Sequence, residues 1–306
     1  MNMPRTDRTG PVSIGDVSVA HVPEWEGSLF TRSGLLPDSS REAWEEERPW
    51  LEPLWWAPDS DRALLCIGSF LVRGGGRTIL VDSGVGNGKP YPDVPPLDRL
   101  STPYLEHLAA LGVRPEDVDL VINTHLHPDH IGWNTMWEDG AWRPTFPNAT
   151  YLLPRTEVDL LSAMAEDPGR PDPLGLVPAF RDSVVPVLRD ARTEVWSGTE
   201  HVVDDALKLV AAPGHSPGSS VLTITSGGES AALVGDLIHH PMQILDPRQR
   251  DVLDDDVVAA RQSRVKILGW AADTSAWVFG GHFHGGRGAR IREAAGGFAI
   301  DSWTSD

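Results

Sequence analysis

Apolar and polar positions in the first part of the chain alternate in short runs that are typical of β-strands. A first strand is expected near Val17–Val22. Two longer apolar runs, Leu64–Val72 and Thr78–Asp82, flank three consecutive glycines, which predicts a β-hairpin with a glycine turn. Leucines with helical spacing follow in Ser101–Leu111, and the next residue is a glycine, which is expected to end this helix.

The second half of the chain echoes this mixture of strands and helices. Further strands are predicted at Asp119–Asn123, Thr150–Leu153, Lys208–Ala212, Ser220–Thr225, Ala231–Gly235 and Ala276–Phe279. Helices are predicted at Glu157–Ala165 and Asp254–Ala272, and a Pro/Gly-rich loop at Asp167–Leu176. Strands mixed with helices in both halves indicate an α/β (α+β) protein in which sheets pack together and helices cover them.

The N-terminal segment differs from the rest of the chain in composition and in its pattern of apolar residues. Residues 42–53 read EAWEEERPWLEP, and regular apolar runs begin only near Ala63. We therefore expect residues 1–60 to be an N-terminal extension that packs on a domain formed by residues 61–306, with a single structural domain overall. A length of 306 residues also allows two tightly joined halves.

Charge and cysteine content narrow the possible partners and compartment. The chain has 26 Lys and Arg against 44 Asp and Glu, a formal charge of −18, which opposes binding to nucleic acid or to an anionic membrane. The single cysteine, Cys66, excludes an internal disulfide and a cysteine-cluster metal site. No apolar stretch approaches the ~18 residues that a membrane span needs, so a soluble, cytoplasmic protein is expected.

A dense group of metal-ligand side chains follows the predicted strand Asp119–Asn123. It reads Thr124-His125-Leu126-His127-Pro128-Asp129-His130. In extended chain, residues i and i+2 point to the same side, so His125 and His127 can approach one ion together. Pro128 suits the first position of a helix, which would turn Asp129 and His130 back over the strand end. This H-x-H-x-D-H pattern predicts a metal site.

Three more candidate ligands follow later strands. His215 lies in a Gly/Pro turn, where a purely structural role is the alternative, and Asp236 and His282 each end an apolar run. An unpaired carboxylate at the end of a buried strand would be costly. A metal site shared by the three residues explains their positions better than three unrelated coincidences of sequence.

Together these motifs resemble the metallo-β-lactamase superfamily. The resemblance rests on Val81-Asp82-Ser83-Gly84, the H-x-H-x-D-H pattern, the Gly-His turn at His215, Gly235-Asp236 and the final His282. It implies an αββα sandwich of two mixed β-sheets flanked by helices, with two metal ions at one edge.

The resemblance also implies a role for each of these residues. His125, His127 and His215 would bind the first metal, Asp129, His130 and His282 the second, and Asp236 would bridge both. Asp82 would orient the H-x-H loop by hydrogen bonding. Imidazole and carboxylate ligands without thiolate suit Zn²⁺, with Fe, Mn or Co as alternatives. His284, two residues after His282, could exchange roles with it.

The implied chemistry is hydrolysis. Two divalent ions sharing a hydroxide lower its pKa from 15.7 to about 7, and this hydroxide attacks a carbonyl or phosphoryl centre. Protonating the departing alkoxide needs an acid, for which His239 and Asp129 are the candidates. The segments Asn123–Asn134, Phe146–Ala149 and Gly235–Gln243 look most like the branch of N-acyl-homoserine lactonases and methyl parathion hydrolase.

The substrate stays open within that branch. The lactonases place a tyrosine three residues after the bridging aspartate, whereas His239 stands there, as in the organophosphate-hydrolysing relatives. A structural role is the alternative for His239. A lactonase or esterase, with quorum quenching as one use, is the leading interpretation. The alternatives are a phosphotriesterase or a thioesterase and, outside the hydrolases, an iron-dependent sulfur dioxygenase-like redox protein.

Tryptophans are the candidates for a substrate pocket. The chain has 12 Trp and three Tyr, and Trp133, Trp137 and Trp142 follow the metal motif directly. They either pack in the core or form an aromatic pocket wall. Trp55 and Trp56 could close the same pocket or pack on a partner subunit of a homodimer. With no basic cluster near the motifs, we expect a small substrate that is uncharged and apolar.

Overall fold

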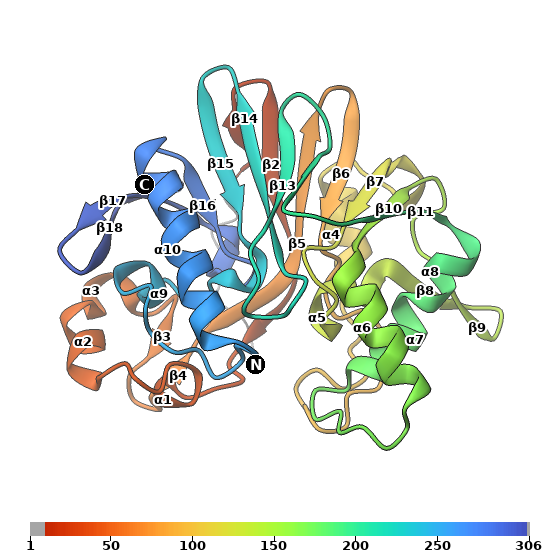
Figure 1. The fold of residues 1–306 in the computed structure, drawn as a ribbon, viewed down its shortest axis with the longest axis horizontal. Helices are drawn as coiled ribbons and strands as arrows, with labels where there is room; N and C mark the ends of the chain where they lie inside the picture. Colours follow the sequence, from red (N-terminus) through yellow and green to blue (C-terminus); the bar gives the residue numbers. More distant parts are fainter. Residues whose placement is uncertain (1–9, 305–306) are drawn as a thin grey trace.

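Two seven-stranded β-sheets pack face to face between two layers of helices in the computed structural model, which describes residues 10–304 (Figure 1). The strand order in the first sheet is β1 (Val12–Ile14), β2 (Val17–Gly27), β5 (Leu65–Gly74), β6 (Arg77–Val81), β7 (Leu120–Ile122), β10 (Thr150–Pro154), β11 (Arg192–Trp196). In the second it is β12 (Glu200–Val202), β13 (Leu207–Ala211), β14 (Ser220–Ser226), β15 (Glu229–Leu233), β16 (Trp277–Phe279), β17 (Gly288–Ala294), β18 (Gly297–Trp303). The predicted fold class is confirmed.

Both sheets are mixed, as the resemblance implied. In the first sheet β6, β7, β10 and β11 are paired in parallel, and in the second β15 and β16 are. The remaining pairs are antiparallel. Two separate short hairpins are formed by β3 (Trp56–Ala57) with β4 (Arg62–Ala63), and by β8 (Thr135–Glu138) with β9 (Ala141–Pro144).

Helices cover the outer face of each sheet (Figure 1). The first sheet is covered by α4 (Tyr104–Ala110), α5 (Pro128–Ile131), α6 (Arg155–Glu166), α7 (Leu176–Ser183) and α8 (Val185–Asp190). The second is covered by α1 (Arg32–Leu35), α2 (Arg41–Glu46), α3 (Arg48–Leu51), α9 (Met242–Leu245) and α10 (Val257–Asp273). Short 3₁₀ turns are η1 (Pro115–Asp117), η2 (Gly132–Asn134), η3 (Gly235–Leu237) and η4 (His284–Gly286).

The sequence of strand β5 is almost continuously apolar because the strand is buried on both faces. Phe70 and Val72 point between the two sheets, where they pack with Leu222 and other residues of the second sheet. Ile67 and Leu71 point the other way and pack under the helices. Because successive side chains of a strand alternate between its faces, a strand that is buried on both faces must be apolar throughout.

The expected N-terminal extension divides into two parts. Strand β2 pairs with β5 from Ser18 opposite Arg73 to Gly27 opposite Leu65, so residues 12–27 are built into the first sheet. The following segment, with α1 to α3 and β3, packs against the outer side of the second sheet. Trp55 and Trp56 are buried there in the core of this chain, where the ring of Trp55 stacks on Trp303.

The predicted strands and helices are confirmed to within a few residues, but several elements were missed, and the two longest such regions lie in the second half of the chain. Residues 176–196 form α7, α8 and β11, and residues 288–303 form the hairpin β17–β18. Both regions carry arginines and acidic residues at exposed positions and have no long apolar run. Their regular structure depends on edge pairing and on packing against neighbours. Within residues 10–304, no helix has both the length and the apolar character needed to cross a bilayer.

Replacing Val72 tests the core between the sheets. Val72 is fully buried, whereas Val202 is 69% exposed on β12. Val72→Ala should lower the free energy of unfolding by about 2 kcal/mol, since about 0.8 kcal/mol is lost per buried methylene-sized group and a cavity remains. Val202→Ala should change it by less than about 0.5 kcal/mol. Urea unfolding of both variants measures this, and equal effects would contradict the described packing.

Candidate metal centre

The loop between β7 and α5 carries the first group of site residues. Pro128 is the first residue of α5, as predicted, and the helix turns His130 back over the end of β7. His125, His127 and His130 are all buried. The ring centroids of His125 lie 4.6 Å from His127 and 4.3 Å from His130, so the three imidazoles are close together.

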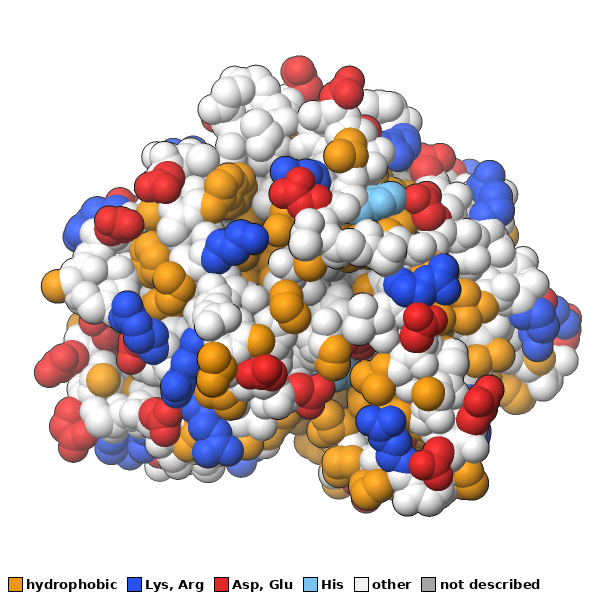
Figure 2. Space-filling model, viewed as in Figure 1, with side chains coloured by type: hydrophobic (Ala, Val, Ile, Leu, Met, Phe, Trp, Pro, Cys, Tyr) orange, Lys and Arg blue, Asp and Glu red, His pale blue; other side chains and the backbone are white. Residues whose placement is uncertain are grey.

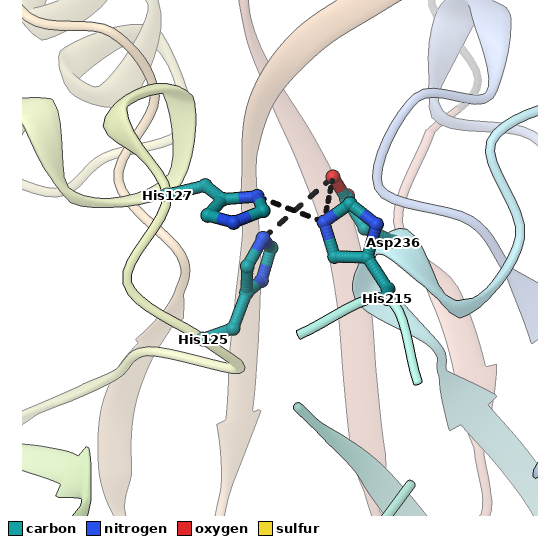
Figure 3. Close-up of side chains that lie close together, drawn as sticks. All are labelled: His125, His127, His215 and Asp236. Carbon is teal, nitrogen blue, oxygen red and sulfur yellow. Dashed lines mark hydrogen bonds and ion pairs between the residues drawn. The ribbon is translucent and has the colours of Figure 1, made fainter. Parts of the chain in front are cut away.

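The second half of the chain delivers His215, Asp236 and His282. They follow β13, β15 and β16, and the structure brings all three to the edge where β7 ends. Figure 3 shows His125 and His127 approaching from one loop and His215 and Asp236 from the opposite side. The tight approach at His215 requires Gly214, which has φ +139°, and a Cβ there would lie 2.1 Å from the backbone nitrogen of Ala260.

The two oxygens of Asp236 face two different groups of histidines. Its Oδ2 lies 3.7 Å from His125 Nε2 and 3.4 Å from His215 Nε2 (Figure 3). Its Oδ1 lies 3.0 Å from His130 Nε2 and 3.1 Å from His282 Nε2. One carboxylate thus stands between two sets of imidazoles.

The remaining predicted ligands complete these two sets. His127 Nδ1 lies 2.8 Å from His215 Nε2 on the Oδ2 side of Asp236. On the other side, Asp129 lies 3.8 Å from His130 Nε2 through Oδ1 and 3.6 Å from His282 Nε2 through Oδ2. The structure therefore brings the seven side chains together in two sets around Asp236.

The chemistry of these groups fits a divalent cation. His125 Nε2, His130 Nε2 and Asp236 Oδ1 are buried, and none has a hydrogen-bond partner among the described residues. Buried polar atoms without partners are rare because each costs free energy. Potential ligand atoms lie within 4.8 Å of one another in three overlapping groups: His125, His127, His215 and Asp236; Asp129, His130 and His282; Asp236, His239 and His282. Nitrogen and oxygen donors without sulfur suit zinc and its first-row neighbours.

Two groups outside the cluster fix its imidazole rings. Asp82 accepts hydrogen bonds from Thr124 N at 2.8 Å and from His130 Nδ1 at 3.0 Å, so it holds the H-x-H loop and one ring. The backbone oxygen of Cys66 accepts from His282 Nδ1 at 2.8 Å. Each bond directs the other ring nitrogen toward the cluster, which is how hydrogen-bond partners orient metal ligands.

Burial and charge leave three members of the cluster, His125, His215 and Asp236, in the forms suited to metal binding. Burial, reinforced by neighbouring imidazoles, lowers the pKa of His125 and of His215 well below the ordinary value. Burial alone would raise the pKa of Asp236, but His130 and His282 outweigh it and lower this pKa well below its usual range. Neutral imidazole and ionised carboxylate are the forms that bind metal ions.

His239 contacts the cluster through Asp236, and its other ring nitrogen faces Asp251, a carboxylate that the sequence did not single out. Its Nε2 lies 3.1 Å from Asp236 Oδ2, and its Nδ1 lies 2.9 Å from Asp251 Oδ2. Burial opposes protonation, but Asp251 and Asp236 outweigh it and raise the pKa of His239 well above the ordinary value. Asp251 is fully buried and also accepts from Leu253 N and Gln243 Nε2. It belongs to an acidic stretch in which no local pattern marks it.

The segment that carries His239 and Asp251 is anchored by Arg264 of α10. This guanidinium is fully buried, and it donates to Pro247 O at 3.0 Å and to Gln249 O at 2.9 Å. It also pairs with Asp254 at 3.1 Å. One arginine therefore fixes the path of the chain beside the cluster.

A cavity of about 360 Å³ opens next to the cluster. Its lining includes Asp129, Asp236, His239 and His282 on the side of the cluster. The rest is mainly apolar and includes Trp25, Leu29, Phe30, Leu65, Ile67, Val85, Tyr91 and Leu97. Figure 2 shows hydrophobic side chains gathered around the hollow at the lower edge of the molecule, between its two halves. A substrate would thus meet polar groups at one end and apolar walls beyond.

The sequence offered Trp133, Trp137 and Trp142 as a pocket wall, and this prediction is corrected here. The cavity lining contains none of the three. Trp133 is buried, donates to Glu24 Oε1 at 2.7 Å and stacks on Tyr104. Trp137 is 59% exposed on the β8–β9 hairpin and packs edge-on against Trp142. The 3₁₀ turn η2 and the hairpin direct these side chains away from the cavity. Trp25, Phe30 and Tyr91 supply the aromatic surface instead.

The other predicted candidates also lie outside the cavity lining. Trp55 and Trp56 are buried in the core of the chain. His240 is buried and donates through Nε2 to Trp55 O at 3.0 Å, which is a structural contact. His284 lies 3.7 Å from Glu26, so His282, rather than His284, faces Asp236.

Two mixed sheets between helices, with a His/Asp cluster at one edge and an adjoining cavity, define the class of αββα metal-dependent hydrolases. The chain belongs to the metallo-beta-lactamase superfamily, which it matches over residues 68–282. A mouse (Mus musculus) protein, metallo-beta-lactamase domain-containing protein 1, is 29% identical over 223 residues, 71% of this chain. The chain spans 66% of that protein's length, just under two thirds.

Solved structures show the same fold at low sequence identity. The hydrolase AbOPH of the beta lactamase superfamily is 23% identical, with a TM-score of 0.74 over 95% of each chain. AidC, a dizinc quorum-quenching lactonase solved with the product N-hexanoyl-L-homoserine, is 22% identical, with a TM-score of 0.74 over 96% of this chain and 98% of AidC. These neighbours show that the chain shares their fold.

Removing Asp236 tests whether one carboxylate serves the whole cluster. Asp236→Ala should lower the metal content and abolish metal-dependent activity, because both sets of imidazoles lose their shared oxygen donor. The control is Asp273→Ala, which removes an exposed carboxylate at the end of α10. Elemental analysis of the zinc-reconstituted proteins gives the result. Full metal content in Asp236→Ala would show that this residue is not a ligand.

Proposed function

We propose that the protein is a dinuclear metal-dependent hydrolase of lactones or carboxylic esters, with zinc as the metal that fits best. The observation that carries this proposal is the placement of Asp236, whose two oxygens face separate imidazole sets beside an apolar cavity. The superfamily and the lactonase neighbours support it. Cys66 is buried and unpaired, which suits a cytoplasmic, reducing compartment.

His125, His127 and His215 would hold one ion, Asp129, His130 and His282 the other, and Asp236 both. When bound, the ions supply Lewis acidity that polarises the scissile carbonyl and activates a water molecule. The apolar wall, with Leu65, Ile67 and Val85, excludes bulk water and receives the acyl portion of the substrate. The ester group is thereby oriented toward Asp129 and His239, which also line the cavity.

His239 is placed to hand a proton to the departing alkoxide. It lines the cavity, and Asp251 faces its Nδ1, so the ring is held in one orientation with Nε2 toward the cluster. Asp129 is the other acidic group of the lining that could serve, and it is also placed among the ligands. The division of labour that we propose is Asp129 as ligand and His239 as proton donor.

Phosphotriester cleavage is the second candidate activity, because a histidine rather than a tyrosine stands three residues after Asp236. A hydrolysis screen of lactones, aryl esters, thioesters and organophosphates with metal-reconstituted protein distinguishes the alternatives. Stoichiometric iron with a visible absorption band in the purified protein would instead indicate redox chemistry and contradict the zinc hydrolase.

Acyl-chain length tests the role of the cavity. Among homologous lactones or esters, each added methylene should lower KM by up to about 0.8 kcal/mol in binding free energy until the cavity is filled. Phosphomonoesters and nucleic acids should be poor substrates, because the chain carries a charge of −18. Steady-state kinetics over the series measure both effects. A preference for the shortest chains would argue against an acyl-binding cavity.

His239→Ala separates a proton donor from a scaffold residue. If His239 protonates the leaving group, kcat/KM should fall by about 10²–10⁴-fold while the metal content stays the same. His201→Ala is the control, since His201 on β12 pairs with Glu194 and lies outside the cavity lining. Unchanged kinetics of His239→Ala on several substrates would leave His239 with a structural role only.

A further inference from the structure

The lining of the cavity beside the metal cluster contains a single arginine and, among the described residues, no lysine. Arg62 of β4 lines this cavity and is half-buried. Its Nε donates to Ser28 Oγ at 2.9 Å and its Nη2 donates to Ser28 O at 2.7 Å. Both contacts are with a single residue, which itself lines the cavity. The guanidinium plane is thus fixed, and Nη1 is not engaged by either bond.

Among the described residues, no carboxylate neutralises Arg62. Within residues 10–304, no Asp or Glu oxygen lies within 4.0 Å of its guanidinium. The nearby Arg32 and Arg41 differ, because Arg32 pairs with Asp61 at 3.4 Å and Arg41 with Glu45 at 3.2 Å. Asp93 also lines the cavity, but it is exposed on its loop and forms no ion pair with Arg62.

Arg62 is outside the groups of potential ligands and precedes β5, the strand whose backbone contacts His282. Leu65 and Ile67 of β5 line the cavity, and the backbone of Cys66 holds His282. Ile67 is five positions after Arg62 in the chain, a span of at most about 17 Å. A substrate whose scissile carbonyl sits at the cluster would therefore pass along Leu65 toward Arg62.

We propose that Arg62 binds an oxygen acceptor, a carbonyl or a carboxylate, that the substrate carries at a distance from its scissile ester. A fixed guanidinium donor without a carboxylate partner is the group that proteins use to recognise such oxygens. This inference rests on the proposed hydrolase function and refines it. The preferred substrate has an apolar middle and a polar far end, rather than being apolar throughout.

Three 4-nitrophenyl esters of equal chain length test this inference: the octanoate, the 7-oxooctanoate and the monoester of octanedioic acid. In Arg62→Met, kcat/KM should fall about tenfold to a hundredfold for the last two esters and by less than about twofold for the octanoate. Arg41→Met should leave all three unchanged, because Arg41 lies outside the cavity lining and pairs with Glu45. Loss confined to the octanedioate monoester would identify the acceptor as a carboxylate, and loss for both a carbonyl oxygen in general.

Binding of unreactive acids gives a second readout. Octanoate and octanedioate each offer one carboxylate to the metals, and only octanedioate has another for Arg62. By calorimetry on the zinc-loaded protein, the wild type should bind octanedioate at least tenfold more tightly than octanoate if the acceptor is a carboxylate. Arg62→Met should abolish that difference. Arg62→Gln, which keeps a donor for Ser28 but no charge, provides a second variant if Arg62→Met unfolds.

The outcomes separate this inference from the proposed function. An equal loss for all three esters, or no loss for any, would overturn the role of Arg62 while leaving the hydrolase intact. If the wild type hydrolyses none of the esters but prefers octanedioate in a manner that depends on Arg62, the ester hydrolase fails and the role of Arg62 stands. If neither turnover nor that preference is seen, both are refuted.

Discussion

The carboxylate of Asp236 is buried where the two halves of the sandwich meet, and five imidazoles converge on its two oxygens. A buried carboxylate is costly unless positive charge or hydrogen bonds surround it. Here the surroundings come from the ends of strands in both sheets. The β7 loop, the turn at His215, the 3₁₀ turn η3 and the segment after β16 must all reach one point. The packing of the two sheets is therefore a condition for the cluster to exist.

A second layer of contacts holds this arrangement from behind. Asp82, at the end of β6, fixes the loop after β7, and the backbone of Cys66 on β5 fixes His282. Arg264 of α10 fixes the segment that carries Asp251, which in turn faces His239. These contacts come from both sheets and from a covering helix. The surrounding framework therefore orients the imidazole rings of the cluster without the need for a bound ion.

The central part of the fold and of the site was predictable from sequence because it depends on patterns within short stretches of consecutive residues. Strand β5 is buried on both faces and so has a continuous apolar run, and the spacing of His125, His127 and Pro128 fixes a strand end followed by a helix. Residues whose role depends on a distant partner leave no such pattern. Asp251 is one acidic residue among several, and Arg62 is a single arginine between polar residues. The prediction that Trp133, Trp137 and Trp142 line the pocket was wrong, because a position next to a motif in the sequence does not determine where a side chain points.

The hydrogen bonds between Cys66 and His282 run in both directions, from Cys66 N to His282 O and from His282 Nδ1 to Cys66 O. They join a strand of the first sheet to a loop of the second at the edge of the cluster. An ion held by ligands from both halves would act across the same seam. By thermodynamic linkage, each bound ion must then oppose separation of the sheets by the free energy with which the closed form binds it more tightly. The availability of metal would therefore determine how strongly the two sheets are held together, as well as the chemistry of the site.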